Sequence, residues 1–127
     1  MIYGIGTDII EVSRIQRAIE KENGFREKVF SPNEIVSCEA KGNKYQSYAA
    51  RFAAKEAFMK AFSSGWTNGI SWNEIEILNH DNGGPYLNLI NGTKELVFSG
   101  KNLLLHVTLS HLKDFATAQV IIETSEI

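Results

Sequence analysis

Three observations in the sequence predict an α+β domain with an antiparallel sheet. Apolar residues recur at helical spacing through most of the first half of the chain and alternate in the second half. Turn-type residues separate the alternating segments at short intervals, which is typical of hairpins. The 127 residues contain no linker or internal repeat, so we expect a single domain over residues 1–127.

Each expected element has its own local signal. The Ile- and Gly-rich start of the chain alternates as a strand, and the Ala- and Lys-rich middle has a composition that favours a long helix. In chain order we expect a strand over 2–10, helices over 13–22, 32–41 and 45–63, strands over 74–78 and 86–90, a helix over 93–99, and strands over 103–110 and 115–122.

Two of the expected helices begin with capping residues. Ser31 is placed as an N-cap, with Pro32 in the first helical position and Glu34 closing a capping box. Ser13 and Gln16 have the same spacing at the start of the first helix, so we expect a second capping box there.

Composition and charge argue against several classes of protein. The 13 basic and 15 acidic residues give a net charge of −2, which disfavours a broad, non-specific nucleic-acid binder. Cys38 is the only cysteine, so it cannot form an intrachain disulfide, and we expect a small buried side chain there. The sequence has neither the pattern of a signal peptide nor an apolar run of about 20 residues. We therefore expect a cytoplasmic protein that binds neither nucleic acid nor membrane.

Glu56 is a candidate site residue because it lies at the edge of an apolar stripe on the long expected helix. At about 100° per residue, it falls within about 40° of Phe52, and small alanines flank it. One interpretation is an i, i+4 ion pair with Lys60 on the surface. The other is a metal ligand or general base held at a cleft, because ions are rarely buried without a partner.

Asp8 is a second candidate, near the end of the first expected strand. Loops at strand ends often present ligand-binding residues, although Asp equally suits a turn or a helix start. Two carboxylates with a nearby lysine would suit Mg²⁺ shared with a phosphate group, but spacing alone does not show that Asp8 and Glu56 meet. Gly4 and Gly6 lack the rest of a dinucleotide-binding fingerprint, and we expect them to allow close packing.

The first expected helix carries a basic face. Arg14, Arg17 and Lys21 lie within about 60° of one another, while Ile15 and Ile19 point about 100–140° away, toward a core. This face is either an ordinary solvated surface or a docking site for an acidic partner helix.

Two segments of the chain resemble the signature motifs of a known family. Residues 1–10 (MIYGIGTDII) and 51–61 (RFAAKEAFMKA) are similar to the paired motifs of the holo-acyl carrier protein synthases. These are small bacterial members of the 4′-phosphopantetheinyl transferase superfamily. The resemblance extends in the same order over nearly the whole chain, with further matches at 29–34, 82–87, 107–111 and 116–121.

The resemblance implies a fold, an activity and an assembly. The fold is an antiparallel sheet wrapped around a long central helix, and relatives of this length are usually homotrimers with sites between subunits. The family consists of Mg²⁺-dependent enzymes of fatty acid biosynthesis. They transfer 4′-phosphopantetheine from coenzyme A to a serine of apo-acyl carrier protein and release adenosine 3′,5′-bisphosphate.

The resemblance also implies roles for individual residues. Asp8 and Glu56 match the Mg²⁺ ligands, Lys60 matches the lysine near the coenzyme A pyrophosphate, and these three are the expected catalytic residues. The serine proton would pass to Glu56 or to a water held by Asp8 and the metal. The expected coenzyme A contacts are Lys44, Arg51 and His106 near the nucleotide and its 3′-phosphate, Lys60 at the pyrophosphate, and Gly83, Gly84 and Pro85 by the adenine. The basic face of Arg14, Arg17 and Lys21 is expected to receive the acyl carrier protein.

The sequence departs from the family pattern at a few positions. Gly84 stands where the family often has Lys, and residues 63–65 read Ser-Ser-Gly instead of Gly-Thr-Gly. Leu109 and Leu112 replace smaller or more polar residues. Since both expected metal ligands are kept, we expect activity to survive and coenzyme A affinity to differ.

Two other functions compete with the enzyme. A non-catalytic module that binds the carrier protein would keep the basic face and lose the carboxylates, whereas this chain keeps both. An unrelated small α+β ligand-binding domain would not bind coenzyme A in a Mg²⁺-dependent way.

Overall fold

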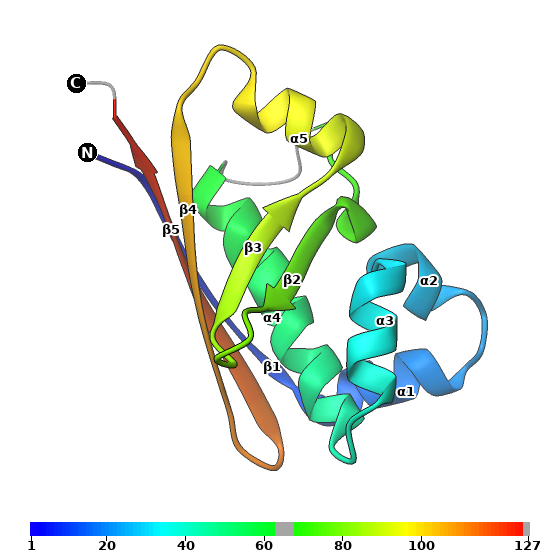
Figure 1. The fold of residues 1–127 in the computed structure, drawn as a ribbon. Coiled ribbons are helices and arrows are strands. Elements are labelled where there is room, and N and C mark those ends of the chain that lie inside the picture. Colours follow the sequence, from blue (N-terminus) through cyan, green and yellow to red (C-terminus); the bar gives the residue numbers. More distant parts are fainter. Residues whose placement is uncertain (63–67, 126–127) are drawn as a thin grey trace.

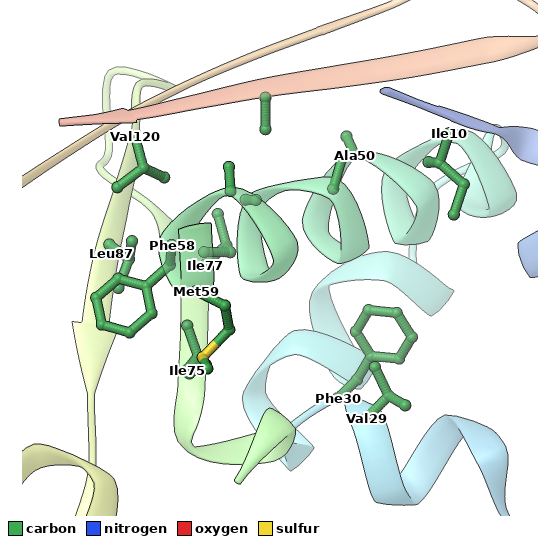
Figure 2. Close-up of a cluster of buried hydrophobic side chains, with 14 of the residues drawn as sticks. Ile10, Val29, Phe30, Ala50, Phe58, Met59, Ile75, Ile77, Leu87 and Val120 are labelled. Atoms are coloured by element: carbon green, nitrogen blue, oxygen red, sulfur yellow. The ribbon is translucent and has the colours of Figure 1, made fainter. Parts of the chain in front are cut away.

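The fold places one long helix between a three-stranded sheet and a layer made of a hairpin and short helices (Figures 1 and 2). The computed structural model describes residues 1–62 and 68–125. In chain order the elements are β1 (Ile2–Glu11), α1 (Val12–Glu20), α2 (Phe25–Val29), α3 (Pro32–Glu39), α4 (Lys44–Phe62), the 3₁₀ helix η1 (Trp72–Glu74), β2 (Ile75–Asn79), β3 (Pro85–Leu89), α5 (Asn91–Phe98), β4 (Leu103–His111) and β5 (Phe115–Thr124).

The strands form two separate antiparallel sheets. The larger has the order β1-β5-β4, so the first strand of the chain pairs with the last, and Asp8 lies opposite Ala118. The smaller is the β2–β3 hairpin. The α+β class and the antiparallel pairing predicted from the sequence are confirmed. The expected sheet around the long helix is present as two pieces on either side of α4 (Figure 1).

Helix α4 packs very closely against β1, and two glycines make this possible. A Cβ atom on Gly4 would overlap the carbonyl oxygen of Ala61, and one on Gly6 would overlap that of Ala57. Glycine at alternate strand positions therefore faces alanine at every fourth helix position, which brings the two backbones together. The close packing expected from the sequence is confirmed. Asp8 follows in the same alternation and so faces α4 as well.

The hydrophobic core fills both sides of α4. Figure 2 shows Phe58 and Met59 of α4 beside Ile75, Ile77 and Leu87 of the hairpin, with Val120 of β5 on the other side of the helix. Most of these side chains are almost completely buried. Burying each one contributes about 1.5–3 kcal/mol, so the core fixes α4 between the two layers.

A buried ion pair connects α4 to the second layer. Lys55 and Glu34 are both fully buried, and the Lys55 ammonium lies 2.7 Å from the Glu34 carboxylate. Lys55 also donates hydrogen bonds to the carbonyl oxygens of Trp72 and Ile75. Burial lowers the pKa of Lys55, and the Glu34 charge opposes that shift. Because removing one partner would strand a buried charge, this pair ties the start of α3 and β2 to α4.

The helix starts show one correct prediction and one error. At α3 the Ser31 side chain accepts from the Glu34 backbone, and the Glu34 side chain accepts from the Ser31 backbone, so the predicted capping box is confirmed. At α1 the box predicted from Ser13 and Gln16 is wrong. That helix begins earlier, after Glu11, without a side-chain cap. The Val12 amide instead donates to the carbonyl of Asp114, so a tertiary contact satisfies that donor.

Two short segments had no counterpart in the sequence analysis, namely α2 and η1. Helix α4 is described up to Phe62. The predicted helix end at residue 63 and the Ser-Ser-Gly departure at 63–65 lie outside the described residues. In the described part of the chain, the helices are too short or too polar to span a bilayer.

Candidate active site

The close packing of β1 on α4 brings two acidic side chains together. Asp8 comes from β1 and Glu56 from α4, and both side chains are only partly exposed. The pKa of Glu56 is raised above its usual value, first by burial and second by the negative charge of Asp8. The second cause shows that the two carboxylates are near enough to repel each other. Sequence spacing left open whether they come near each other, and in the structure they do. Asp8 lies in a strand and not in a turn.

Lys60 lies one helical turn after Glu56 and belongs to the same cluster. Its ammonium is 3.0 Å from a carboxylate oxygen of Asp8 and donates a second hydrogen bond to the carbonyl of Thr7. Among the described residues, Lys60 forms its ion pair with Asp8 and not with Glu56, so the surface i, i+4 pair is not formed. The Lys60 side chain is 54% exposed, which leaves the ammonium accessible to an anionic ligand.

The carboxylate pair fits a divalent cation. A cation near both carboxylates would offset the repulsion from Asp8 that raises the pKa of Glu56. Within the described residues, no group of three or more His, Cys, Asp or Glu side chains is placed to hold a metal. Two protein carboxylates suit Mg²⁺, which keeps several waters or phosphate oxygens as its remaining ligands.

A cavity of about 410 Å³ opens beside this cluster. It extends from Asp8 and Lys60 across β1 to the neighbouring strand, and its lining residues are Thr7, Asp8, Ile9, Lys60, Thr117 and Gln119. The Gln119 amide donates to the hydroxyl of Thr117. The cavity therefore has a charged end at the cluster and an uncharged floor on the sheet, where Ile9 lies among polar side chains.

The predicted basic face begins at the acidic cluster. Arg14, Arg17 and Lys21 are all exposed on α1, while Ile15 is buried, as the helical spacing predicted. Burial and Asp8 raise the pKa of Glu56, and the positive charges of Lys60 and Arg14 oppose that rise, so the first arginine of this face is within electrostatic range of Glu56. A partner held on this face would therefore lie next to the cluster.

The predicted turn of Gly83, Gly84 and Pro85 lies in a different part of the molecule. It connects β2 to β3 and is closed by hydrogen bonds from the His80 amide to Gly84 and from the Gly83 amide to His80. Gly83 has a φ of +92°, a conformation that favours glycine. Its Cβ position is open, so the backbone conformation is what requires glycine there.

Arg51 is placed on a different face of α4 from Glu56. It is only 2% exposed, and its guanidinium donates to the Ile77 carbonyl, the Ser47 hydroxyl and the Asn79 side chain. Five residues of helix separate it from Glu56, which corresponds to about 140° of rotation. One chain alone therefore does not bring Arg51 to the carboxylate pair.

Lys44 and His106 also lie apart from the cluster. Lys44 begins α4 and forms an ion pair of 3.3 Å with Glu39, at the edge of a second cavity of about 650 Å³. It is separated from Lys60 by about 24 Å of helix. His106 lies on the outer face of the larger sheet, 2.6 Å from Glu123. In one chain these residues are therefore not gathered around the carboxylate pair.

The sequence analysis missed Asn79 and Thr7. Asn79 joins Arg51 to the turn, because its amide group also donates to the Gly83 carbonyl. Thr7 contributes a backbone oxygen to Lys60, which no side-chain pattern reveals. The position of Asn79 could have singled it out, because it ends the alternating segment of β2 and comes just before turn-type residues.

Comparison with known proteins identifies the superfamily that this chain resembles. A family model described as the 4′-phosphopantetheinyl transferase superfamily matches residues 4–121, which is most of the chain. The match includes β1 and α4, the two elements that bring the carboxylates together.

Individual relatives identify the family within this superfamily. The chain is 47% identical over 123 residues to the holo-[acyl-carrier-protein] synthase of Cytophaga hutchinsonii, covering 95% of this chain and 97% of the relative. It is 50% identical over 126 residues to that of Ruminiclostridium cellulolyticum, covering 96% and 92%. The fold agrees with a Bacillus anthracis holo-(acyl-carrier-protein) synthase solved in complex with CoA (3′,5′-ADP), with a TM-score of 0.81, 38% identity, and 98% and 99% coverage. This chain belongs to the holo-[acyl-carrier-protein] synthase family of the superfamily.

Proposed function

We propose that this protein is a holo-[acyl-carrier-protein] synthase enzyme. It transfers the 4′-phosphopantetheine group of coenzyme A to a serine of apo-acyl carrier protein and releases adenosine 3′,5′-bisphosphate. The observation that carries the proposal is the carboxylate pair Asp8 and Glu56 with Lys60 beside it, in a chain of this family. We further propose that the reaction serves fatty acid biosynthesis in the cytoplasm.

The charges of the cluster support transfer at a diphosphate. Asp8 and Glu56 would hold Mg²⁺, which neutralises phosphate charge and stabilises the leaving oxygen when it is bound. Lys60 is largely exposed and is anchored by Asp8 and Thr7, so its ammonium can pair with a phosphate oxygen. Such transfers depend on alignment and charge stabilisation more than on covalent help from the protein.

Two groups can receive the proton of the attacking serine. The Glu56 carboxylate is one, because its raised pKa makes it a better proton acceptor than an ordinary glutamate. A water beside Asp8 is the other. Glu56 is within electrostatic range of Arg14, near the start of α1, so a carrier protein bound to Arg14, Arg17 and Lys21 would present its serine near these acceptors.

We also propose that the active enzyme is a homotrimer. The outer face of the larger sheet exposes apolar side chains, among them Ile5 at 66%, Ile9 at 65% and Leu104 at 60%. Large exposed apolar side chains on one face of a sheet are typical of an interface. An assembly would also bring a second chain's Arg51, His106 and turn toward the cluster, which a single chain does not do.

The first experiment is intact-mass spectrometry of apo-acyl carrier protein after incubation with this protein, coenzyme A and Mg²⁺. We expect a mass gain of one phosphopantetheine group that disappears when EDTA is added. An Asp8→Ala variant is the matched control, because it should keep the fold and the basic face while losing the mass gain.

The competing carrier-binding module gives a different result. A folded sample that binds the carrier in a pull-down but leaves its mass unchanged, with several carriers tried, would contradict the enzyme and favour the module. Binding of coenzyme A that needs Mg²⁺ would argue against an unrelated ligand-binding domain.

A further inference from the structure

Arg51 is a buried cation that donates several hydrogen bonds to neighbouring groups of the described residues. Its guanidinium donates through Nε to the Ile77 carbonyl at 3.1 Å and through Nη1 to the Ser47 hydroxyl at 2.6 Å. Its Nη2 donates to Asn79 at 2.8 Å, with a longer contact of 3.4 Å to the Ser37 hydroxyl. At 2% exposure, such a group cannot contact a ligand without giving up internal partners.

Asn79 links Arg51 to the turn between β2 and β3 by hydrogen bonds. Its Oδ1 accepts from Arg51, and its Nδ2 donates to the Gly83 carbonyl at 2.9 Å. Because one end of the amide must accept and the other must donate, these two contacts fix its orientation. Asn79 therefore connects α4 to Gly83 through two hydrogen bonds.

Among the described residues, the other hydrogen bonds of this turn are made within the turn itself. The His80 amide donates to Gly84, the Gly83 amide donates to His80, and the Gly84 amide donates to the Asn82 side chain. These contacts set the shape of residues 80–84 but do not fix the turn against α4. In the described residues, the contact from Asn79 to Gly83 supplies that attachment.

We infer that Arg51 and Asn79 are positioning residues that hold this turn in place for coenzyme A. Arg51 acts on coenzyme A through Asn79 and the turn, and not by touching the 3′-phosphate. This inference rests on the proposed function, in which the turn of Gly83, Gly84 and Pro85 lies by the adenine. It replaces the direct contact that was expected for Arg51 from the family resemblance.

The first test is the uncharged variant Asn79→Ala, which removes the link and adds no charge near the phosphates. Losing one such hydrogen bond should raise the KM for coenzyme A by about three- to tenfold, with kcat and the KM for the carrier protein unchanged. The matched control is Asn102→Ala, an exposed Asn before β4 whose Nδ2 donates to Ser125. The control should leave all three constants at their wild-type values.

The second test separates positioning from direct phosphate contact. Both Asn79→Ala and Arg51→Lys are assayed with coenzyme A and with dephospho-coenzyme A, which lacks the 3′-phosphate. Positioning predicts that each variant raises the KM of the two substrates by the same factor. A variant at Arg51 that selectively weakens coenzyme A, and so removes the preference over dephospho-coenzyme A, would overturn the inference.

Thermal unfolding of every variant shows whether the fold is intact. If Arg51→Lys does not fold, Asn79→Ala still decides the matter, because Asn79 is exposed and its loss leaves the core unchanged. An unchanged KM in Asn79→Ala, with wild-type protein that transfers normally, overturns this inference alone. Wild-type protein that neither binds nor transfers coenzyme A overturns the proposed function and this inference with it.

Discussion

Single residues in the acidic cluster are arranged for reaction at the expense of stability. Glu56 has a raised pKa because burial and Asp8 both disfavour its charged form. A carboxyl whose pKa is higher in the folded than in the unfolded protein costs stability at neutral pH, since the charge is better solvated after unfolding. The cost disappears when the charge is removed or a cation is bound.

Glu56→Gln tests this conflict directly. We expect turnover to fall by about 100-fold or more, because a charged ligand and proton acceptor is lost. We expect the melting temperature without metal to stay equal or rise, because the repulsion with Asp8 is gone. Calorimetry and the carrier mass assay measure the two effects. A clear drop in melting temperature would contradict this account of Glu56.

Cys38 shows the opposite case of a residue without a reactive role. It is fully buried, its sulfur lies 3.4 Å from the Ser47 hydroxyl, and burial raises the pKa of its thiol. The reactive thiolate is therefore both scarce and inaccessible.

We expect the native protein to react with a thiol reagent such as DTNB at pH 8 at least about 100-fold more slowly than the unfolded protein. The unfolded protein in guanidinium chloride is the control. Rapid labelling of the native chain would show that α3 opens away from α4.

Sequence reasoning at the residue scale found the charged side chains but not all their partners. Asp8, Glu56 and Lys60 were recognised as candidates, but that they meet depends on packing between elements far apart in the chain. Arg51 was expected to contact coenzyme A only because the family resemblance implies it. Its burial depends on acceptors from Ile77 and Asn79, which local patterns cannot place.

At the scale of elements, the contact between β1 and α4 decides whether the site forms. The backbones approach so closely that any side chain on Gly6 would meet the Ala57 carbonyl. A shift of either element to relieve that overlap would also move Asp8 relative to Glu56.

Gly6→Ala should therefore destabilise the protein by about 3 kcal/mol or more, since the overlap is with backbone and cannot be relieved by a rotamer change. Gly42→Ala is the matched control, because a Cβ there meets nothing within 4 Å. Urea unfolding measures both. If Gly6→Ala unfolds at the same urea concentration as the control, the close packing is not required.

Element boundaries were predicted well where local signals are strong. The Ser31 box marks α3, and the alternating segments mark β2 to β5 within one or two residues. Helix α2 was missed because it has only five residues and directly follows Asn23 and Gly24, which are typical turn residues. Its start is supported by a contact from the Phe25 amide to the Asn23 side chain.

At the scale of the whole molecule, the larger sheet has one covered and one uncovered face. The inner face packs on α4, while the outer face exposes Ile5, Ile9 and Leu104. The sequence alternation predicted a two-faced sheet but could not say what covers the second face. Nor could it predict that β1 pairs with β5, because no local signal links strands at opposite ends of a chain.

Ile9→Asp tests the proposed trimer. A charge on this apolar face should convert trimers into smaller species at micromolar concentration and lower transfer activity, while far-ultraviolet circular dichroism stays unchanged. Val36→Asp is the control, since Val36 is 73% exposed on α3, away from the sheet. Light scattering after size-exclusion chromatography gives the masses. A wild-type monomer with full activity would contradict the trimer.

The pairing of β1 with β5 also sets the order of events during synthesis on the ribosome. Thr7 and Gln119, which lie opposite each other, are 112 residues apart in the chain. At bacterial speeds of about 5–20 residues per second, the strand that carries Asp8 waits on the order of ten seconds for its partner. Until then a nascent chain has α4 with Glu56 and Lys60 but no sheet to hold Asp8 against them. An unfinished polypeptide would accordingly be inert, and catalytic competence would come only with the last strand translated.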